Sequence, residues 1–259
     1  MIEGTEHAHN RYSFAVENHV AVIELKDRAI DVLINLEQRE DLFELLTTIE
    51  EAPDVDALVH LVASDYPGDQ KHREILEAVT RDATIASKRA ILIGRMGHTI
   101  SQLVLRLAQY SRPLVAGFEG HISADELGVF LTNDFRFAAE DCQFSFPNLR
   151  LGFPVSGPLA YYLVRYLGQG KAAEILLNDR SISAREARAL GLVTDLVPSK
   201  HLKQRCLEQV GELRRLSPLA VVATRQMIQP EVSAFADFLN RSTDKMRATC
   251  KREAFSRNA

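Results

Sequence analysis

The order of secondary structure predicted between Pro113 and Gly157 constrains the fold more than any other part of the chain. The apolar run PLVAGF is typical of a buried strand, and the polar residues after it suit a turn into a helix N-terminus. Strands and a helix therefore alternate within one short segment, which predicts a mixed α/β fold. The elements expected here are a strand at 113–118, a helix at 123–131, and strands at 135–138 and 143–146.

The rest of the chain alternates in a similar way. Apolar residues recur with a period of two at 13–25 and with helical spacing at 35–52, and ALVHLVAS is a nearly continuous apolar strand. Strand, strand and helix recur about every 50 residues, which favours a spiral of ββα units over a doubly wound sheet. The other elements expected are a strand at 57–64, a charged helix-prone stretch at 73–90, an apolar helix at 91–109, and a strand or helix at 160–167.

The last part of the sequence has helical tracts at 200–227 and 232–251 without intervening strands. We therefore divide the chain into a core at 1–198 and a C-terminal helical region at 199–259. A helical appendage of this kind can pack on a neighbouring subunit, so we expect the second region to take part in oligomerisation.

Composition excludes several classes of function. The formal net charge of −4 gives no basis for nucleic-acid binding, and no segment has the roughly 18 consecutive apolar residues that cross a bilayer. The three cysteines fit neither a disulfide framework nor a metal site, and we expect no bound metal. The polar first fifteen residues do not resemble a signal peptide, so we expect a cytoplasmic protein.

Five segments, in order along the chain, resemble the crotonase (enoyl-CoA hydratase/isomerase) superfamily. The resemblance covers roughly residues 13–240, and its most specific match is LGQGKAAEILLNDRSISAREARALGLVTDLVP at 167–198. It implies a crotonase-like spiral fold and a homotrimer or a dimer of trimers. It also implies a small-molecule acyl-CoA (or acyl-carrier thioester) as the ligand. Coenzyme A is then part of the substrate, and no separate cofactor is required.

The resemblance also implies a mechanism. Enzymes of this superfamily direct two backbone N–H groups at the thioester carbonyl oxygen and stabilise the enolate that forms there. By position, the amides of Gly68 and Asp125 correspond to these two donors. Arg28, Ala29 and Ile30 match the turn that contacts coenzyme A, where a basic side chain suits the phosphates; a surface arginine is the alternative.

The start of the helix at 123–131 has the pattern of a capping box. Ser123 could accept a hydrogen bond from the amide of Glu126, and Glu126 could reach back to the amide of Ser123. Such a cap would leave the amide of Asp125 available to a ligand. Both acids also have a structural interpretation, since carboxylates in a first helical turn are favoured by the helix dipole. His121, just before this helix, could contact a ligand or cap the sheet.

The resemblance places the two glutamates of a hydratase at Gly128 and Asn148, neither of which exchanges protons near neutral pH. Asn148 could orient a substrate or a water molecule, or simply satisfy the backbone of a turn. We therefore expect an isomerase or lyase acting through an enolate, with Asp125 or Glu126 as the acid–base group. A crotonase-fold binding or scaffold protein without turnover, and a thioester hydrolase, remain as alternatives.

Overall fold

The fold is described from a computed structural model of the 259-residue chain. The structure describes residues 6–8, 11–27, 31–32, 35–62, 70, 73–74, 77, 86–178 and 180–251. The strands are β1 (Glu6–Ala8), β2 (Tyr12–Glu17), β3 (Val20–Leu25), β4 (Ala57–Val62), β5 (Leu114–Phe118), β6 (His121–Ser123), β7 (Phe135–Ala139), β8 (Gln143–Ser145), β9 (Ile182–Ser183) and β10 (Asp195–Val197). The helices are α2 (Leu36–Glu51), α4 (Ala86–Ala108), α5 (Ala124–Phe130), α6 (Gly157–Leu177), α7 (Ala184–Ala189), the 3₁₀ helix η1 (Ser199–His201), α8 (Leu202–Leu213), α9 (Pro218–Ile228) and α10 (Val232–Lys251).

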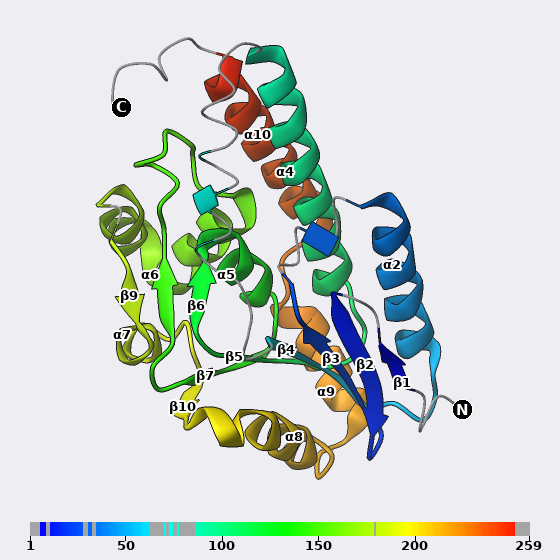
Figure 1. The fold of residues 1–259 in the computed structure, drawn as a ribbon. Coiled ribbons are helices and arrows are strands. Elements are labelled where there is room, and N and C mark those ends of the chain that lie inside the picture. Colours follow the sequence, from blue (N-terminus) through cyan, green and yellow to red (C-terminus); the bar gives the residue numbers. More distant parts are fainter. Residues whose placement is uncertain are drawn as a thin grey trace.

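Seven strands form one large sheet in the order β1-β2-β3-β4-β5-β7-β10 (Figure 1). The pairs β1–β2 and β2–β3 are antiparallel, and every later pair is parallel. All six residues of β4 are buried. This explains its nearly continuous apolar sequence, because a central parallel strand is covered on both faces.

Two consecutive ββα units build the centre of the molecule. In each unit the first strand (β5 or β7) joins the large sheet, the second (β6 or β8) joins a small sheet of order β6-β8-β9, and a helix (α5 or α6) follows. The predicted spiral of ββα units is therefore confirmed. The units begin at Leu114 and Phe135, so they follow each other much more closely than the predicted interval of about 50 residues.

Helices cover both faces of the large sheet. On one face, Leu202, Cys206 and Val210 of α8 form a core with side chains of β3, β4, β5 and β7. The larger core contains residues of α2, α4, α5 and α6 together with other strand residues, and α10 lies along α4 (Figure 1). The described part of region 199–259 thus shares both cores with the rest of the chain. Its role in oligomerisation stays a prediction.

Most predicted elements that fall on described residues are found close to their expected bounds, with three differences. The predicted helical tract at 200–227 is divided into η1, α8 and α9. Most of the predicted helix-prone stretch at 73–90 lies outside the residues that the structure describes. Residues 160–167 lie inside the long helix α6, whose path kinks at Gly168, which has a φ of +75°. The predicted helix at 91–109 begins earlier, because α4 starts at Ala86. Among the helices that the structure describes, none is long and apolar enough to cross a bilayer.

Candidate functional site

The first turn of α5 places two acidic side chains inside the protein. The chain leaves β5, turns at Gly120 with a φ of +73°, and passes through β6 directly into α5. Asp125 is 7% exposed and Glu126 is 1% exposed, so the helix start is buried and is not a solvated surface turn. Neither residue is without an interaction partner. Both acids stand in the first turn of α5, as the structural interpretation by the helix dipole requires, but neither is a solvated surface residue.

The predicted capping box at this helix is also wrong. Ser123 occupies the N-cap position with extended backbone angles, but its side chain makes no capping hydrogen bond. Ser123 is also the last residue of β6, where it pairs with Ser145 of β8 and is completely buried. The strand pairing, and not a side-chain cap, therefore holds the backbone at the start of α5.

Asp125 and Asn148 line the same small cavity. Its volume is about 20 Å³, and Asp125, Asn148 and Ser156 are among the polar residues that line it. All three residues are more than nine-tenths buried. The other lining residues come from α4, from the loop before α6 and the start of α6, and from α10: Ile93, Met96, Gly97, Ile100, Ser101, Phe153, Gly157, Pro158, Thr243 and Met246.

Unlike Asp125, Glu126 does not take part in the described lining of this cavity. It follows Asp125 on the helix, but among the described residues it does not line the cavity. Successive helical positions point in different directions, so only one of the two acids can face a given space. The structure thus brings together two of the predicted site residues, Asp125 and Asn148, and places Glu126 elsewhere in the core.

Asn148 is held in the turn that links β8 to α6. Its backbone carbonyl accepts a hydrogen bond from the amide of Phe153 at 2.7 Å, which closes the loop over the residues between them. Asn148 is 2% exposed. The bond to Phe153 joins two backbone groups, so the predicted satisfaction of the turn by the Asn148 side chain stays a prediction.

Gly128 leaves no room for a side chain. A Cβ atom built on Gly128 would lie 2.8 Å from the backbone nitrogen of Leu159, in the first turn of α6. The position where the resemblance places the first hydratase glutamate is thus closed by the main chain of a neighbouring helix. Sequence alone showed the glycine but not the backbone that packs against it.

Helix α10 forms one wall of the cavity and packs closely against α4 and α6. A Cβ atom on Gly97 of α4 would lie 3.0 Å from Oγ1 of Thr243, and one on Gly157 of α6 would lie 2.8 Å from Oγ of Ser242. Two glycines therefore let α10 approach both helices. The C-terminal region contributes directly to the space around Asp125.

None of the remaining predicted site residues is among the described residues that line this cavity. Gly68, Arg28, Ala29 and Ile30 lie outside the residues that the structure describes, so their predicted roles stay predictions. His121 of β6 is exposed. In the described ranges, no group of three or more His, Cys, Asp and Glu side chains is arranged to hold a metal ion.

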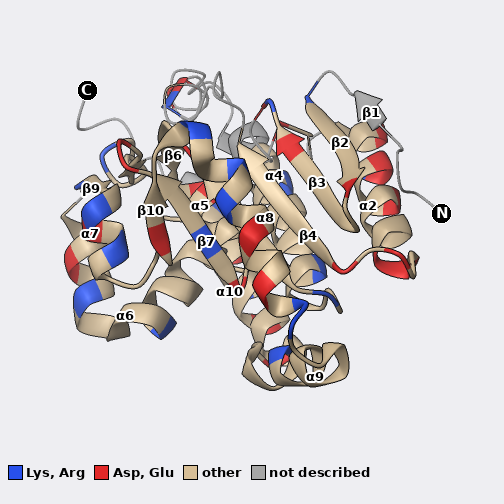
Figure 2. Cartoon of the chain, turned by 90° about the horizontal axis from the view of Figure 1, so that it is seen from below, with Lys and Arg blue, Asp and Glu red and all other residues tan. Residues whose placement is uncertain are grey.

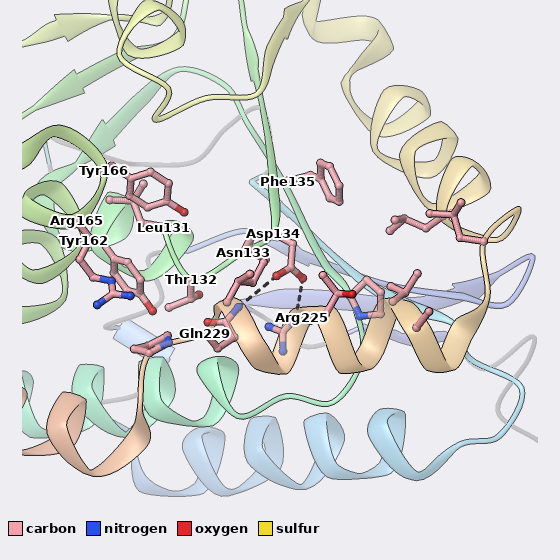
Figure 3. Close-up of a pocket in the computed structure, with 18 of the residues that line it drawn as sticks. Leu131, Thr132, Asn133, Asp134, Phe135, Tyr162, Arg165, Tyr166, Arg225 and Gln229 are labelled. Carbon is pink, nitrogen blue, oxygen red and sulfur yellow. Dashed lines mark hydrogen bonds and ion pairs between the residues drawn. The ribbon is translucent and has the colours of Figure 1, made fainter.

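A second and much larger space was not foreseen from the sequence. A groove of about 720 Å³ runs between the start of β5, the start of β7, α6 and α9 (Figure 3). The ion pair of Asp134 and Arg225 lines this groove. The rings of Tyr162 and Tyr166 lie on the side of the groove away from α9. Burial raises the pKa of Tyr162 well above its usual value. None of its described lining residues is shared with the Asp125 cavity.

Comparison with known proteins agrees with the fold. The family model "Enoyl-CoA hydratase/isomerase" matches residues 80–249. The chain belongs to the enoyl-CoA hydratase/isomerase family, within the crotonase superfamily.

Individual relatives are distant. A 2,3-dehydroadipyl-CoA hydratase of Escherichia coli is 30% identical over 138 residues, which are 53% of this chain and 54% of that protein. The chain thus spans about half the length of this relative. A Thermus thermophilus protein provisionally assigned as an enoyl-CoA hydratase is 26% identical over 82% of this chain and 81% of its own. The crystal structure of an enoyl-CoA hydratase from Bacillus halodurans superposes with a TM-score of 0.79 at 17% identity, covering 96% of this chain and 98% of that one.

Proposed function

We propose that the protein acts on an acyl-CoA thioester through an enolate, as an isomerase or a lyase. The observation that carries this proposal is the position of Asp125, a buried carboxyl group in the first turn of α5 that lines the same cavity as Asn148. Coenzyme A enters as part of the substrate, and the reaction requires no separate cofactor.

In the proposed reaction, the carboxylate of Asp125 removes a proton from the α-carbon of the acyl group. The electrons of the C–H bond form the enolate, and its negative charge develops on the thioester oxygen. The backbone amides of Gly68 and Asp125 donate hydrogen bonds to this oxygen. In an isomerase, Asp125 returns the proton to another carbon of the acyl chain. In a lyase, cleavage of a bond at the α-carbon supplies the same enolate, which is then protonated.

Hydration of an enoyl-CoA by two glutamates fits the residues of this chain less well than isomerase or lyase chemistry does. The resemblance assigns the glutamate positions to Gly128 and Asn148. The backbone of Leu159 closes the space beside Gly128, and the amide of Asn148 does not titrate. One carboxyl group beside the cavity supports proton transfer at carbon, which needs a single base. Glu126 is the less favoured base because it does not line the cavity among the described residues.

The contacts with the rest of the substrate extend this proposal. Arg28 would pair with the phosphates of coenzyme A, and Ala29 and Ile30 would pack beside it. We also propose that the active form is a homo-oligomer, a trimer or a dimer of trimers according to the resemblance.

The alternative function is binding without turnover. A cavity of about 20 Å³ has room for about one water molecule, and Asp125 beside it already has an interaction partner. A scaffold that only binds acyl-CoA would need neither a larger cavity at this position nor a carboxyl group available for proton transfer. A thioester hydrolase is the third possibility, with Asp125, Glu126 and the exposed His121 as the groups able to activate water.

Two measurements on the full chain separate these functions. Thermal denaturation with a panel of acyl-CoAs of increasing chain length tests binding, because a ligand that binds the native state raises the melting temperature. Incorporation of deuterium from D₂O at the α-carbon of a bound acyl-CoA tests for the enolate. Binding with exchange supports the enzyme, whereas binding without exchange supports the scaffold. Release of free coenzyme A without exchange identifies a hydrolase, and no stabilisation by any acyl-CoA contradicts the proposal.

A further inference from the structure

Ser156 precedes helix α6 but does not cap it. It occupies the N-cap position with extended backbone angles, and its side chain makes no capping hydrogen bond. A serine at this position usually accepts a hydrogen bond from the amide of the second or third helical residue. The second helical residue here is Pro158, which has no N–H to donate. The hydroxyl of Ser156 is therefore not used to hold the start of α6.

The same hydroxyl is buried without a hydrogen-bond partner. Ser156 is 3% exposed, and no group in the described part of the chain forms a hydrogen bond with its Oγ. Burying a hydroxyl in this state is unfavourable, because the group loses its bonds to water and gains none in return. An oxygen atom of a ligand placed against Ser156 would supply that bond.

The cavity beside Ser156 has the size and the polarity to take one oxygen atom. Ser156 shares the lining with Asp125 and Asn148, and the volume of about 20 Å³ has room for a group about as large as a water molecule. A serine hydroxyl can donate or accept, so it can bond to a keto oxygen or to a hydroxyl group. The apolar residues of the lining, which suit the carbon atoms of an acyl chain, include Ile93, Met96, Ile100, Phe153 and Met246.

The charge around the cavity disfavours a carboxylate on the ligand. Among the described residues that line the cavity, Asp125 is the one acid, and none is Lys, Arg or His. The basic residues of α6, Arg165 and Lys171, are among those coloured blue in Figure 2, and neither lines the cavity. A carboxylate placed there would meet the acid of Asp125 without a counter-charge. The oxygen that suits Ser156 is therefore a neutral one.

We infer that Ser156 determines the substrate class, an acyl-CoA whose acyl chain carries a hydroxyl or keto oxygen that bonds to the Ser156 hydroxyl. The inference rests on the proposed function, because that function places the acyl group beside Asp125. It separates three kinds of acyl group. An unsubstituted chain leaves the hydroxyl of Ser156 unpaired, a chain with a carboxylate is repelled by Asp125, and a chain with a neutral oxygen satisfies Ser156.

The test is isothermal titration calorimetry of the full chain with acyl-CoAs whose acyl groups all have four carbon atoms. These are butyryl-CoA, 3-hydroxybutyryl-CoA, 4-hydroxybutyryl-CoA, acetoacetyl-CoA and succinyl-CoA. At least one of the three with a neutral oxygen should bind about three- to tenfold more tightly than butyryl-CoA, as one additional hydrogen bond allows. Succinyl-CoA, which carries the carboxylate, should bind most weakly.

In Ser156→Ala the affinity for the favoured oxygenated acyl-CoA should fall to that for butyryl-CoA, whose own affinity should stay unchanged. Ser217→Ala is the matched control. Ser217 is the N-cap of α9, its hydroxyl does accept from the amide of Ala220, and it does not line the cavity. This variant should keep the wild-type ratio of affinities.

Three results would overturn the inference and leave the proposed function standing. They are equal binding of butyryl-CoA and all the oxygenated acyl-CoAs, tightest binding of succinyl-CoA, and a preference that survives in Ser156→Ala. If none of the acyl-CoAs binds, the proposed function is contradicted and this inference falls with it. The melting temperature of ligand-free Ser156→Ala gives an independent reading. It should be unchanged or higher, and a clear decrease would overturn the inference by showing that the hydroxyl has a partner within the protein.

Discussion

The guanidinium of Arg225 on α9 and the carboxylate of Asp134 at the start of β7 form a buried ion pair, 91 residues apart in sequence and 2.7 Å apart in space. Their side chains are 5% and 12% exposed. Oδ2 of Asp134 also accepts from the amide of Leu114, and Oδ1 accepts from the side chain of Gln229. One carboxylate thus joins the start of two sheet strands to the end of α9.

Replacing Asp134 should destabilise the protein strongly. Asp134→Ala leaves the buried guanidinium of Arg225 without its counter-charge, which typically costs about 3–5 kcal/mol of unfolding free energy. Asp56→Ala is the matched control, because Asp56 and Arg214 also lie 2.7 Å apart but are 49% and 34% exposed. An exposed pair of this kind contributes roughly 0–1 kcal/mol. Urea denaturation measures both values, and similar losses in the two variants would show that the buried pair has no special role.

Gly128 should tolerate no side chain. Gly128→Ala places a methyl group 2.8 Å from the backbone nitrogen of Leu159, so α5 and α6 must separate. We expect a loss of about 1–3 kcal/mol, as in other overpacked cores. Gly211→Ala in α8 is the control, because nothing lies within 4 Å of the place that its methyl group would take, and it should stabilise the helix by up to about 1 kcal/mol. If Gly128→Ala were as stable as Gly211→Ala, the close contact of the two helices would be wrong.

The sequence predicted the elements of the fold well, because their signals are local. The apolar run of β4 and the helical spacing of α2 fix these elements from their own residues. The capping box at Ser123 failed for the opposite reason. The hydroxyl could bond to Glu126 in an isolated helix, but pairing of β6 with β8 buries Ser123, and no local pattern contains that pairing.

The site was only partly predictable. Asp125 and Asn148 were both named from the sequence, yet their meeting at one cavity depends on α4, α6 and α10, which lie far away in the chain. The orientation of α9 could not be predicted, because Leu219 and Met227 look the same in sequence whether they pack inside the chain or face outward. Burial of Arg225 is the signal that distinguishes the two cases, and it becomes visible only when Asp134 is placed beside it.

The buried His60 should make stability depend on pH. His60 on β4 lies 3.0 Å from Oδ1 of Asn133, and burial lowers its pKa from 6.5 to about 4. Between these two pH values the unfolded chain binds a proton that the folded chain does not bind. The free energy of unfolding should therefore fall as the pH drops from 6.5 to 4, by up to about 3 kcal/mol from this group.

His60→Gln provides the comparison, because glutamine keeps a hydrogen-bond donor for Asn133 and does not titrate. Urea denaturation at a series of pH values should show a weaker loss of stability in the variant between pH 6.5 and 4. Parallel curves for wild type and variant would mean that His60 titrates alike in the folded and unfolded chains.

Asp125 and Glu126 should differ in their effect on deuterium exchange. Asp125→Asn removes the proposed base, and the exchange rate at the α-carbon should fall about 10²–10⁴-fold, the usual contribution of general acid–base catalysis. Glu126→Gln should keep most of the rate, because Glu126 is not among the described residues that line the cavity. Glu140→Gln is the control, because Glu140 is exposed after β7 and this substitution should leave the exchange rate unchanged. Loss of exchange in Glu126→Gln alone would assign the base to Glu126.

The most direct measurement is a crystal structure with an acyl-CoA analogue in which a methylene group replaces the thioester sulfur, so that the carbonyl remains but cannot be cleaved. The proposed function predicts that the carbonyl oxygen lies within hydrogen-bonding distance of the backbone nitrogens of Gly68 and Asp125, with the α-carbon beside the Asp125 carboxylate. An analogue bound with its carbonyl away from the start of α5, or no bound analogue at saturating concentration, would contradict it.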